Sequence, residues 1–150
     1  MRPRLGDVIE IETPKGLAYA QYTHEHRDPP RYGSLLRILP GIYSQRPSDF
    51  AALVAEEERF SVFFPLGAAL RRRIVFRIVA DEAIPAGKSA FPTFRSRQGD
   101  VWWLWDGKRE HRARRRDTWT PRAINEVWND TLLIDRIASG WTPADDPELS

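Results

Sequence analysis

Two histidines, His24 and His26, stand one residue apart and are followed by Asp28. On a β-strand, residues two apart point to the same face, so both imidazoles would project together beside this carboxylate. Imidazole and carboxylate groups are common zinc ligands. Two imidazoles without a third ligand at a recognisable spacing do not define a metal site, and a solvated strand end explains them equally well. We therefore assign no metal site and retain only His24 and His26 as candidate ligands.

No local pattern of a catalytic site surrounds the remaining acidic and nucleophilic residues. His111 is the third histidine, and it lies in neither a Gly-x-Ser-x-Gly nor a His-Glu-x-x-His context. The glutamates at 56–58 are typical of a solvated helix face, and Asp81-Glu82 is typical of a turn that follows a strand. The sequence predicts no catalytic residue, and an unrecognised hydrolase is the third alternative for function.

Tryptophan is concentrated in residues 101–105, Val-Trp-Trp-Leu-Trp. On a strand Trp103 and Trp105 face one side while Trp102 and Leu104 face the other, so both faces are apolar. An antiparallel strand usually leaves one face in water. We expect C-terminal helices to cover the second face; the alternative is an exposed aromatic platform, because Trp and Arg are enriched at interface hot spots.

Six basic residues follow in the stretch 108–116, directly after Asp106-Gly107. The simplest interpretation of this stretch is a solvated edge strand whose charges prevent edge-to-edge pairing with another chain. It could also dock an acidic protein, where charge accelerates association, or contact nucleic-acid phosphates. The chain holds 23 basic and 21 acidic residues, a net charge of +2, which argues against nucleic acid. The candidate binding residues are Trp102, Trp105, Arg109, Arg112, Arg114, Arg115 and Arg116.

The elements that must position these residues are mostly strands. Residues 6–12 and 17–22 alternate in polarity around a turn at 14–16, which predicts a β-hairpin. Asp106-Gly107 predicts a second hairpin, because Asp-Gly readily adopts the positive φ angles of a tight turn. Residues rich in aromatic and β-branched side chains predict further strands at 34–39, 60–64 and 74–79. We expect one contiguous core of Val8 or Ile9, Ile11, Tyr22, Leu36, Ile38, Phe63, Phe76 and Ile78.

Helical signals are confined to two regions. Ser48 or Asp49 can cap a short helix that reaches residue 58. Thr120-Pro121 can open a C-terminal helix, and a break at Asn129-Asp130 separates it from a second helix that Gly140 ends. The break is required because the apolar stripes before and after it face different directions; they comprise Ile124, Val127 and Trp128, then Leu133, Ile134 and Ile137. We expect Trp119 and Trp141 to anchor these helices.

The length of 150 residues fits one domain. The predicted fold class is α+β, a strongly bent, barrel-like antiparallel sheet with C-terminal helices packed on it; residues 1–112 form the β core, 120–141 a helical cap and 142–150 a tail. The chain has no cysteine, and its opening residues lack the apolar segment of a secretory signal. Its longest apolar runs are far shorter than a membrane span. We expect a cytoplasmic location and no membrane partner.

Several short patterns belong together: Gly6-Asp7-Val8 with Ile11, the turn at 14–16, residues 18–22, the 74–79 strand, and Pro85-Ala86-Gly87 with Phe94. This group of residues resembles immunity protein family 26 of bacterial polymorphic toxin systems. It covers the first two-thirds of the chain, and the basic stretch and helical C-terminus depart from it. The resemblance implies a small α+β protein with a curved sheet that neutralises a cognate toxin without a cofactor. We therefore expect an intracellular protein-binding module; the alternative is a nucleic-acid-binding small β-barrel.

Overall fold

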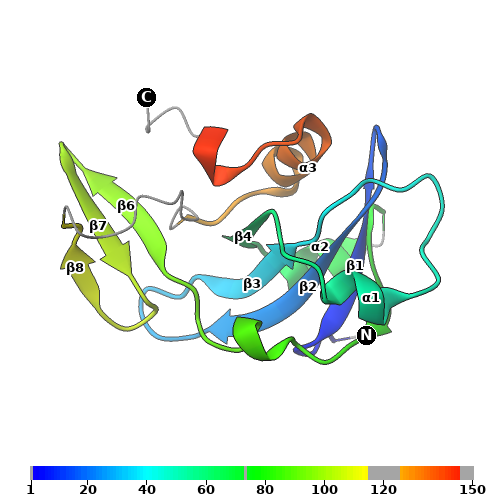
Figure 1. Cartoon of the computed structure of the whole chain (residues 1–150), viewed down its shortest axis with the longest axis horizontal. Helices are drawn as coiled ribbons and strands as arrows, with labels where there is room; N and C mark the ends of the chain where they lie inside the picture. The colour runs from blue at the N-terminus through cyan, green and yellow to red at the C-terminus, as the bar shows by residue number, and fades with distance from the viewer. Residues whose placement is uncertain (1, 73, 115–125, 146–150) are drawn as a thin grey trace.

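The computed structural model describes residues 2–72, 74–114 and 126–145 (Figure 1). The fold is mixed α+β with two antiparallel sheets. The first sheet has the order β4-β3-β2-β1-β5 and consists of β1 Asp7–Thr13, β2 Gly16–His26, β3 Gly33–Ile38, β4 Phe60–Phe63 and β5 Phe76–Asp81. The second sheet has the order β6-β7-β8 and consists of β6 Phe94–Gln98, β7 Val101–Trp105 and β8 Glu110–Arg112. The helices are α1 Phe50–Val54, α2 Leu66–Arg72 and α3 Asp130–Ser139, with 3-10 turns η1 Ala86–Lys88 and η2 Pro143–Asp145.

The hairpin expected at the start of the chain is confirmed. β1 and β2 pair from Val8 opposite Gln21 to Thr13 opposite Gly16. Gly16 has a φ of +134°, and a Cβ there would lie 2.7 Å from the carbonyl oxygen of Tyr43. Only glycine therefore fits where the Tyr43 backbone approaches the hairpin.

A β-bulge at Thr23 changes which residues of β2 share a face. Tyr22 lies opposite Leu36 and His24 lies opposite Leu35, so Thr23 is the additional residue. Alternation restarts after such a residue. Tyr22 therefore shares a face with Glu25, three positions later, whereas His24 continues the face of Gln21.

The core lies on both faces of the first sheet. The largest cluster contains six of the expected residues, with Ile78 packed at its margin: Ile9, Ile11, Tyr22, Leu36, Ile38 and Phe76. Phe63 was wrongly placed in this core, because it belongs with Leu35 and Phe94 to a separate cluster that joins the two sheets. Val8 packs on the opposite face of β1 with Tyr19 and Leu39.

Several elements differ from the expectation. Residues 66–72, which lie between the strands expected at 60–64 and 74–79, form the helix α2, whose Leu66 and Ala69 are buried. β6 lies in the segment 81–99, whose prolines and glycines predict an ordered loop packed on the sheet. The helix expected to reach residue 58 ends at Val54, although Asp49 caps it as expected, accepting a hydrogen bond from the backbone N–H of Ala52. Among the described residues neither sheet closes on itself, so a barrel-like closure is not confirmed.

The C-terminal helix α3 begins and ends where the sequence predicts. The Asn129 side chain accepts a hydrogen bond from the backbone N–H of Leu132, and Gly140 ends the helix in a left-handed conformation. Val127 is half exposed and bridges to Phe63 as extended chain, so the helical stripe expected there is wrong. Most of that expected helix, with Trp119, lies outside the described residues. Trp141 packs against Trp128 and Phe60 and anchors the C-terminal segment as expected.

The C-terminal helix does not provide the cover expected for the Trp strand. Leu133 and Ile137 of α3 belong to the main core, so α3 packs on the five-stranded sheet. Among the described C-terminal residues, η2 contacts the second sheet through the carbonyl oxygen of Pro143, which accepts a hydrogen bond from Arg95. The three-stranded sheet consequently extends from one end of the molecule.

Candidate functional site

The hairpin β7–β8 carries most of the candidate binding residues that the structure describes. Trp103 lies directly opposite Arg112, and Trp105 lies opposite Glu110. The connection comprises residues 106–109, and Asp106 accepts hydrogen bonds from the backbone N–H groups of Lys108 and Arg109. These two bonds lower the pKa of Asp106, the bond from Arg109 having the larger effect. The turn is therefore longer than the two-residue Asp-Gly connection that the sequence suggested.

Trp105 has a structural role in this hairpin. Its ring packs edge-on to the His26 ring, with 4.9 Å between the ring centroids, and the centroid of the Phe91 ring is 5.5 Å away. The rings of Tyr32 and Phe63 also lie beside it. Aromatic pairs at such distances contribute to packing. Trp105 therefore attaches the second sheet to the first, and its ring is not a free binding platform.

Trp102 lies on the opposite face and is covered by arginine. The guanidinium carbons of Arg95 and Arg97 lie 5.0 and 5.7 Å from its ring centroid. Arg95 is buried and also donates to the Pro143 carbonyl oxygen. The Trp102 face is thus occupied by cation–π contacts within the chain.

The sequence reasoning did not select Trp103, although the structure places it opposite the exposed Arg112. Trp103 is partly exposed and shares a sheet face with Arg112. Strand alternation alone indicated the shared face, because Trp103 and Arg112 lie on the same side of the hairpin whether β7 and β8 are joined by two residues or by four. Trp103 and Arg112 are consequently the aromatic and cationic residues that this face offers together.

The basic residues of the hairpin are exposed. Arg109, Arg112 and Arg114 are all exposed, whereas Arg115 and Arg116 lie outside the described residues. Within the described part of the chain, no salt bridge involves Lys108, Arg109 or Arg112. Residues 94–114 contain six basic and three acidic side chains, so the rest of the chain has a net charge of −1. All the excess positive charge thus belongs to the second sheet.

His24 and His26 share a face as expected, and both rings contact Phe91. Each histidine uses both of its ring nitrogens. In His24, Nε2 lies 2.9 Å from the Ser89 carbonyl oxygen and Nδ1 lies 3.0 Å from the Thr23 hydroxyl. In His26, Nε2 lies 3.2 Å from the Gly107 carbonyl oxygen and Nδ1 accepts from the Tyr32 backbone N–H. A metal ion would have to displace one of these partners, and the described residues contain no group of three or more potential ligands.

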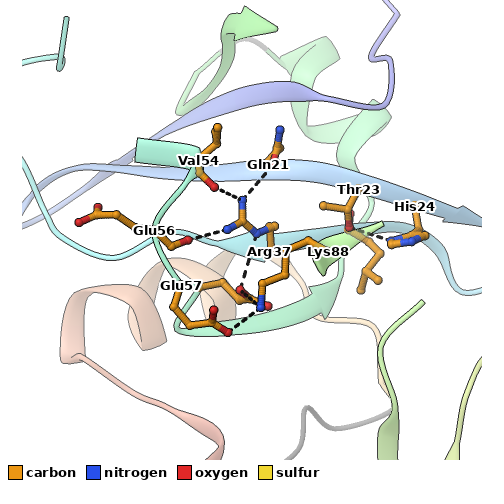
Figure 2. Close-up of polar contacts among 10 residues, drawn as sticks. Gln21, Thr23, His24, Arg37, Val54, Glu56, Glu57 and Lys88 are labelled. Carbon is orange, nitrogen blue, oxygen red and sulfur yellow. Dashed lines mark hydrogen bonds and ion pairs between the residues drawn. The ribbon is translucent and has the colours of Figure 1, made fainter. Parts of the chain in front are cut away.

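A buried polar cluster lies where β2 and β3 meet the segment after α1. Arg37 is only 2% exposed, and Figure 2 shows its guanidinium among Gln21, Val54 and Glu56. Nη1 donates to the Gln21 side chain and the Val54 carbonyl oxygen at 2.9 and 3.0 Å, and Nη2 donates to the Glu56 carbonyl oxygen at 2.6 Å. Burial lowers the pKa of Arg37, and nearby glutamates oppose that shift. Arg37 therefore fastens the 54–58 segment to the sheet.

Lys88 extends this cluster to the loop after β5. Its ammonium group lies 2.6 Å from Glu57 and 2.9 Å from Glu58. Burial opposes the charge on Lys88, but the hydrogen bonds to both glutamates outweigh it and raise the pKa of Lys88. The same contact lowers the pKa of Glu57. The charged groups therefore neutralise one another, which favours a structural role for this cluster over general acid or base catalysis.

Comparison of the chain with protein families, characterised proteins and solved structures finds no match. Among the described residues, no helix has the length and apolar character required to cross a bilayer. The geometry of the chain itself therefore has to indicate its function; among the described residues, Lys108, Arg109 and Arg112 of the basic hairpin are exposed and form no salt bridge.

Proposed function

We propose that this chain is a protein-binding module that docks an acidic protein partner on the β7–β8 hairpin. The observation that carries the proposal is the concentration of the chain's whole positive excess in the second sheet, where Arg109 and Arg112 are exposed and Arg112 lies opposite Trp103. Arginine forms bidentate contacts with carboxylates, and a neighbouring tryptophan supplies apolar area. A surface of this kind suits a partner rich in Asp and Glu.

The resemblance to immunity proteins makes a toxin domain our preferred partner. An immunity protein of this kind would act inside the cell and inhibit by covering the toxin's functional surface, which requires no catalytic residue and no cofactor. Charge complementarity would accelerate association. Rapid capture is useful to an inhibitor that must act before its target does.

The hairpin is less suited to nucleic acid. Binding to single strands relies on aromatic rings onto which bases stack. Trp102 is already stacked by Arg95 and Arg97, and the Trp105 ring packs against the first sheet. The remaining chain carries a net charge of −1, so it adds no general attraction for phosphates. Of the three tryptophans on β7, Trp103 is the one left as a small platform.

The test is a charge reversal of the hairpin. The double variant Arg109→Glu/Arg112→Glu should keep its fold, because exposed charges contribute little to stability. Its association with the partner isolated from the native host should slow by about tenfold or more at low salt. A matched variant, Arg4→Glu/Lys15→Glu, makes the same charge change away from the hairpin and should associate at about the wild-type rate. Equal rates for both variants, or a ligand that nuclease removes, would contradict the proposal.

A further inference from the structure

A second basic site lies at the C-terminal end of β2, on the face that Tyr22 and Glu25 share. A hollow of about 770 Å³ opens there between the N-terminal segment, β2, β3 and α2. Its polar lining consists of Arg2, Tyr22, Glu25, Arg27, Ser34 and Arg71. Three of these six side chains are arginines that come from three different parts of the chain.

The bulge at Thr23 builds the floor of this hollow. It places Tyr22 and Glu25 on one face of β2, although their spacing would put them on opposite faces of a regular strand. The Tyr22 hydroxyl donates to Glu25 at 2.5 Å, and the hydroxyl of Ser34, which lies directly across from Glu25, donates at 2.9 Å. Burial and the hydrogen bond to Glu25 raise the pKa of Tyr22 to about 12. In the floor, both hydroxyl groups therefore donate their protons to the Glu25 carboxylate.

The arginines around this floor form no polar contacts with other described residues of the chain. Arg2, Arg27 and Arg71 are exposed, and no hydrogen bond or salt bridge of their side chains occurs among the described residues. Glu25 is the one carboxylate of the lining. The lining thus has a net charge of +2, supplied by guanidinium groups that face a shared hollow.

We propose that this hollow binds the phosphate group of a small phosphorylated molecule. Guanidinium forks match the oxygens of phosphate in bidentate geometry. A phosphate monoester carries a charge of about −1.5 to −2 at pH 7, which balances the net charge of the lining. The volume lies in the range of small-molecule sites and leaves space for an organic group beyond the phosphate.

Calorimetric titration with inorganic phosphate and with phenyl phosphate, at constant ionic strength, tests the site. We expect saturable binding with one equivalent per chain. Replacing two of the arginines, Arg27→Gln/Arg71→Gln, should weaken both affinities by about tenfold or more, the cost of losing charge-assisted hydrogen bonds. The control Arg109→Gln/Arg112→Gln removes the same charge from the hairpin and should change them by less than about twofold.

A second variant tests the same hollow by another route. Gly67 borders it within helix α2, and a Cβ there would lie 3.5 Å from Nη1 of Arg71. Gly67→Asp should set a carboxylate beside that guanidinium and displace phosphate, again by about tenfold or more. Circular dichroism verifies the fold of each variant. The proposal is overturned by an absence of saturation, or by equal losses in the hollow and hairpin variants, since that result would indicate only general charge attraction.

Discussion

The hydroxyl of Tyr19 donates a hydrogen bond of 2.9 Å to the buried carboxylate of Glu10, directly across the first hairpin. Arg46 donates two further bonds to the same carboxylate, at 2.7 and 3.1 Å. The hydrogen bond from Arg46 contributes most to lowering the pKa of Glu10, and it outweighs the opposing effect of burial. Burial, with the bond to Glu10, raises the pKa of Tyr19.

This arrangement makes the free energy of unfolding depend on pH. Because the pKa of Glu10 is lower in the folded state, its contribution is complete above the ordinary value of 4.5 and is lost as the pH falls through the folded value. Glu10→Gln should cost about 2 kcal/mol at pH 7 and flatten the acid side of the stability curve. Urea unfolding between pH 3 and pH 7 is the measurement. Glu12→Gln, at a half-exposed position, is the control and should leave the curve nearly unchanged.

Arg37 should be more costly to remove than any exposed arginine. Arg37→Met leaves the Gln21 side-chain oxygen and two carbonyl oxygens without their donor, and leaves Lys88 as the partner of Glu58. We expect a loss of about 3–5 kcal/mol in the free energy of unfolding. Arg77→Met removes a half-exposed arginine on β5 and should cost about 1 kcal/mol or less. Similar losses for the two variants would show that the Arg37 contacts are not stabilising.

The two glycines of the second sheet provide a matched test of how it attaches to the first. Gly107 and Gly99 both have positive φ, but a Cβ at Gly107 would lie 2.7 Å from the Phe91 ring, whereas nothing lies within 4 Å at Gly99. Gly99→Ala should therefore cost about 1 kcal/mol of backbone strain. Gly107→Ala should cost clearly more and increase amide exchange at His26, whose ring bonds to the Gly107 carbonyl oxygen. Equal losses of unfolding free energy for the two variants would argue against the close approach of Gly107 to the Phe91 ring.

Trp105 and Trp103 should separate stability from binding. Trp105→Ala removes a ring that contacts residues of both sheets, and we expect a loss of about 3–5 kcal/mol in thermal or urea unfolding. Trp103→Ala should have a much smaller effect on the free energy of unfolding, and it should weaken binding of the protein partner by more than about 1 kcal/mol. The opposite ranking in stability would assign Trp103 to the core.

Elements with local signals were predictable from the sequence, and those stabilised by distant contacts were not. The first hairpin follows from alternation and Gly16, and α3 from Asn129 and Gly140. β6 has one large apolar residue, Phe94, and owes its extended form to pairing with β7. Helix α2 follows Pro65 and is stabilised by burial of its apolar residues, which composition did not reveal.

The candidate site was predictable only in outline. The basic hairpin was found, but which tryptophan is available depended on the packing of the second sheet against Phe63. The hollow beside β2 was not found, because it depends on the bulge. No glycine or proline marks Thr23 as an additional residue, so Tyr22 and Glu25 were not expected on one face.

That bulge also determines how this strand responds to a change in length. Deleting Thr23 would make Tyr22 and His24 consecutive residues of a regular strand, and each would keep the face and the partner on β3 that it has now. The two histidines would stay on the side of Phe91, and the Glu25 side chain would stay on the side of Tyr22. A single codon lost at this position would therefore remove the bulge and leave the chemistry of both surfaces in place.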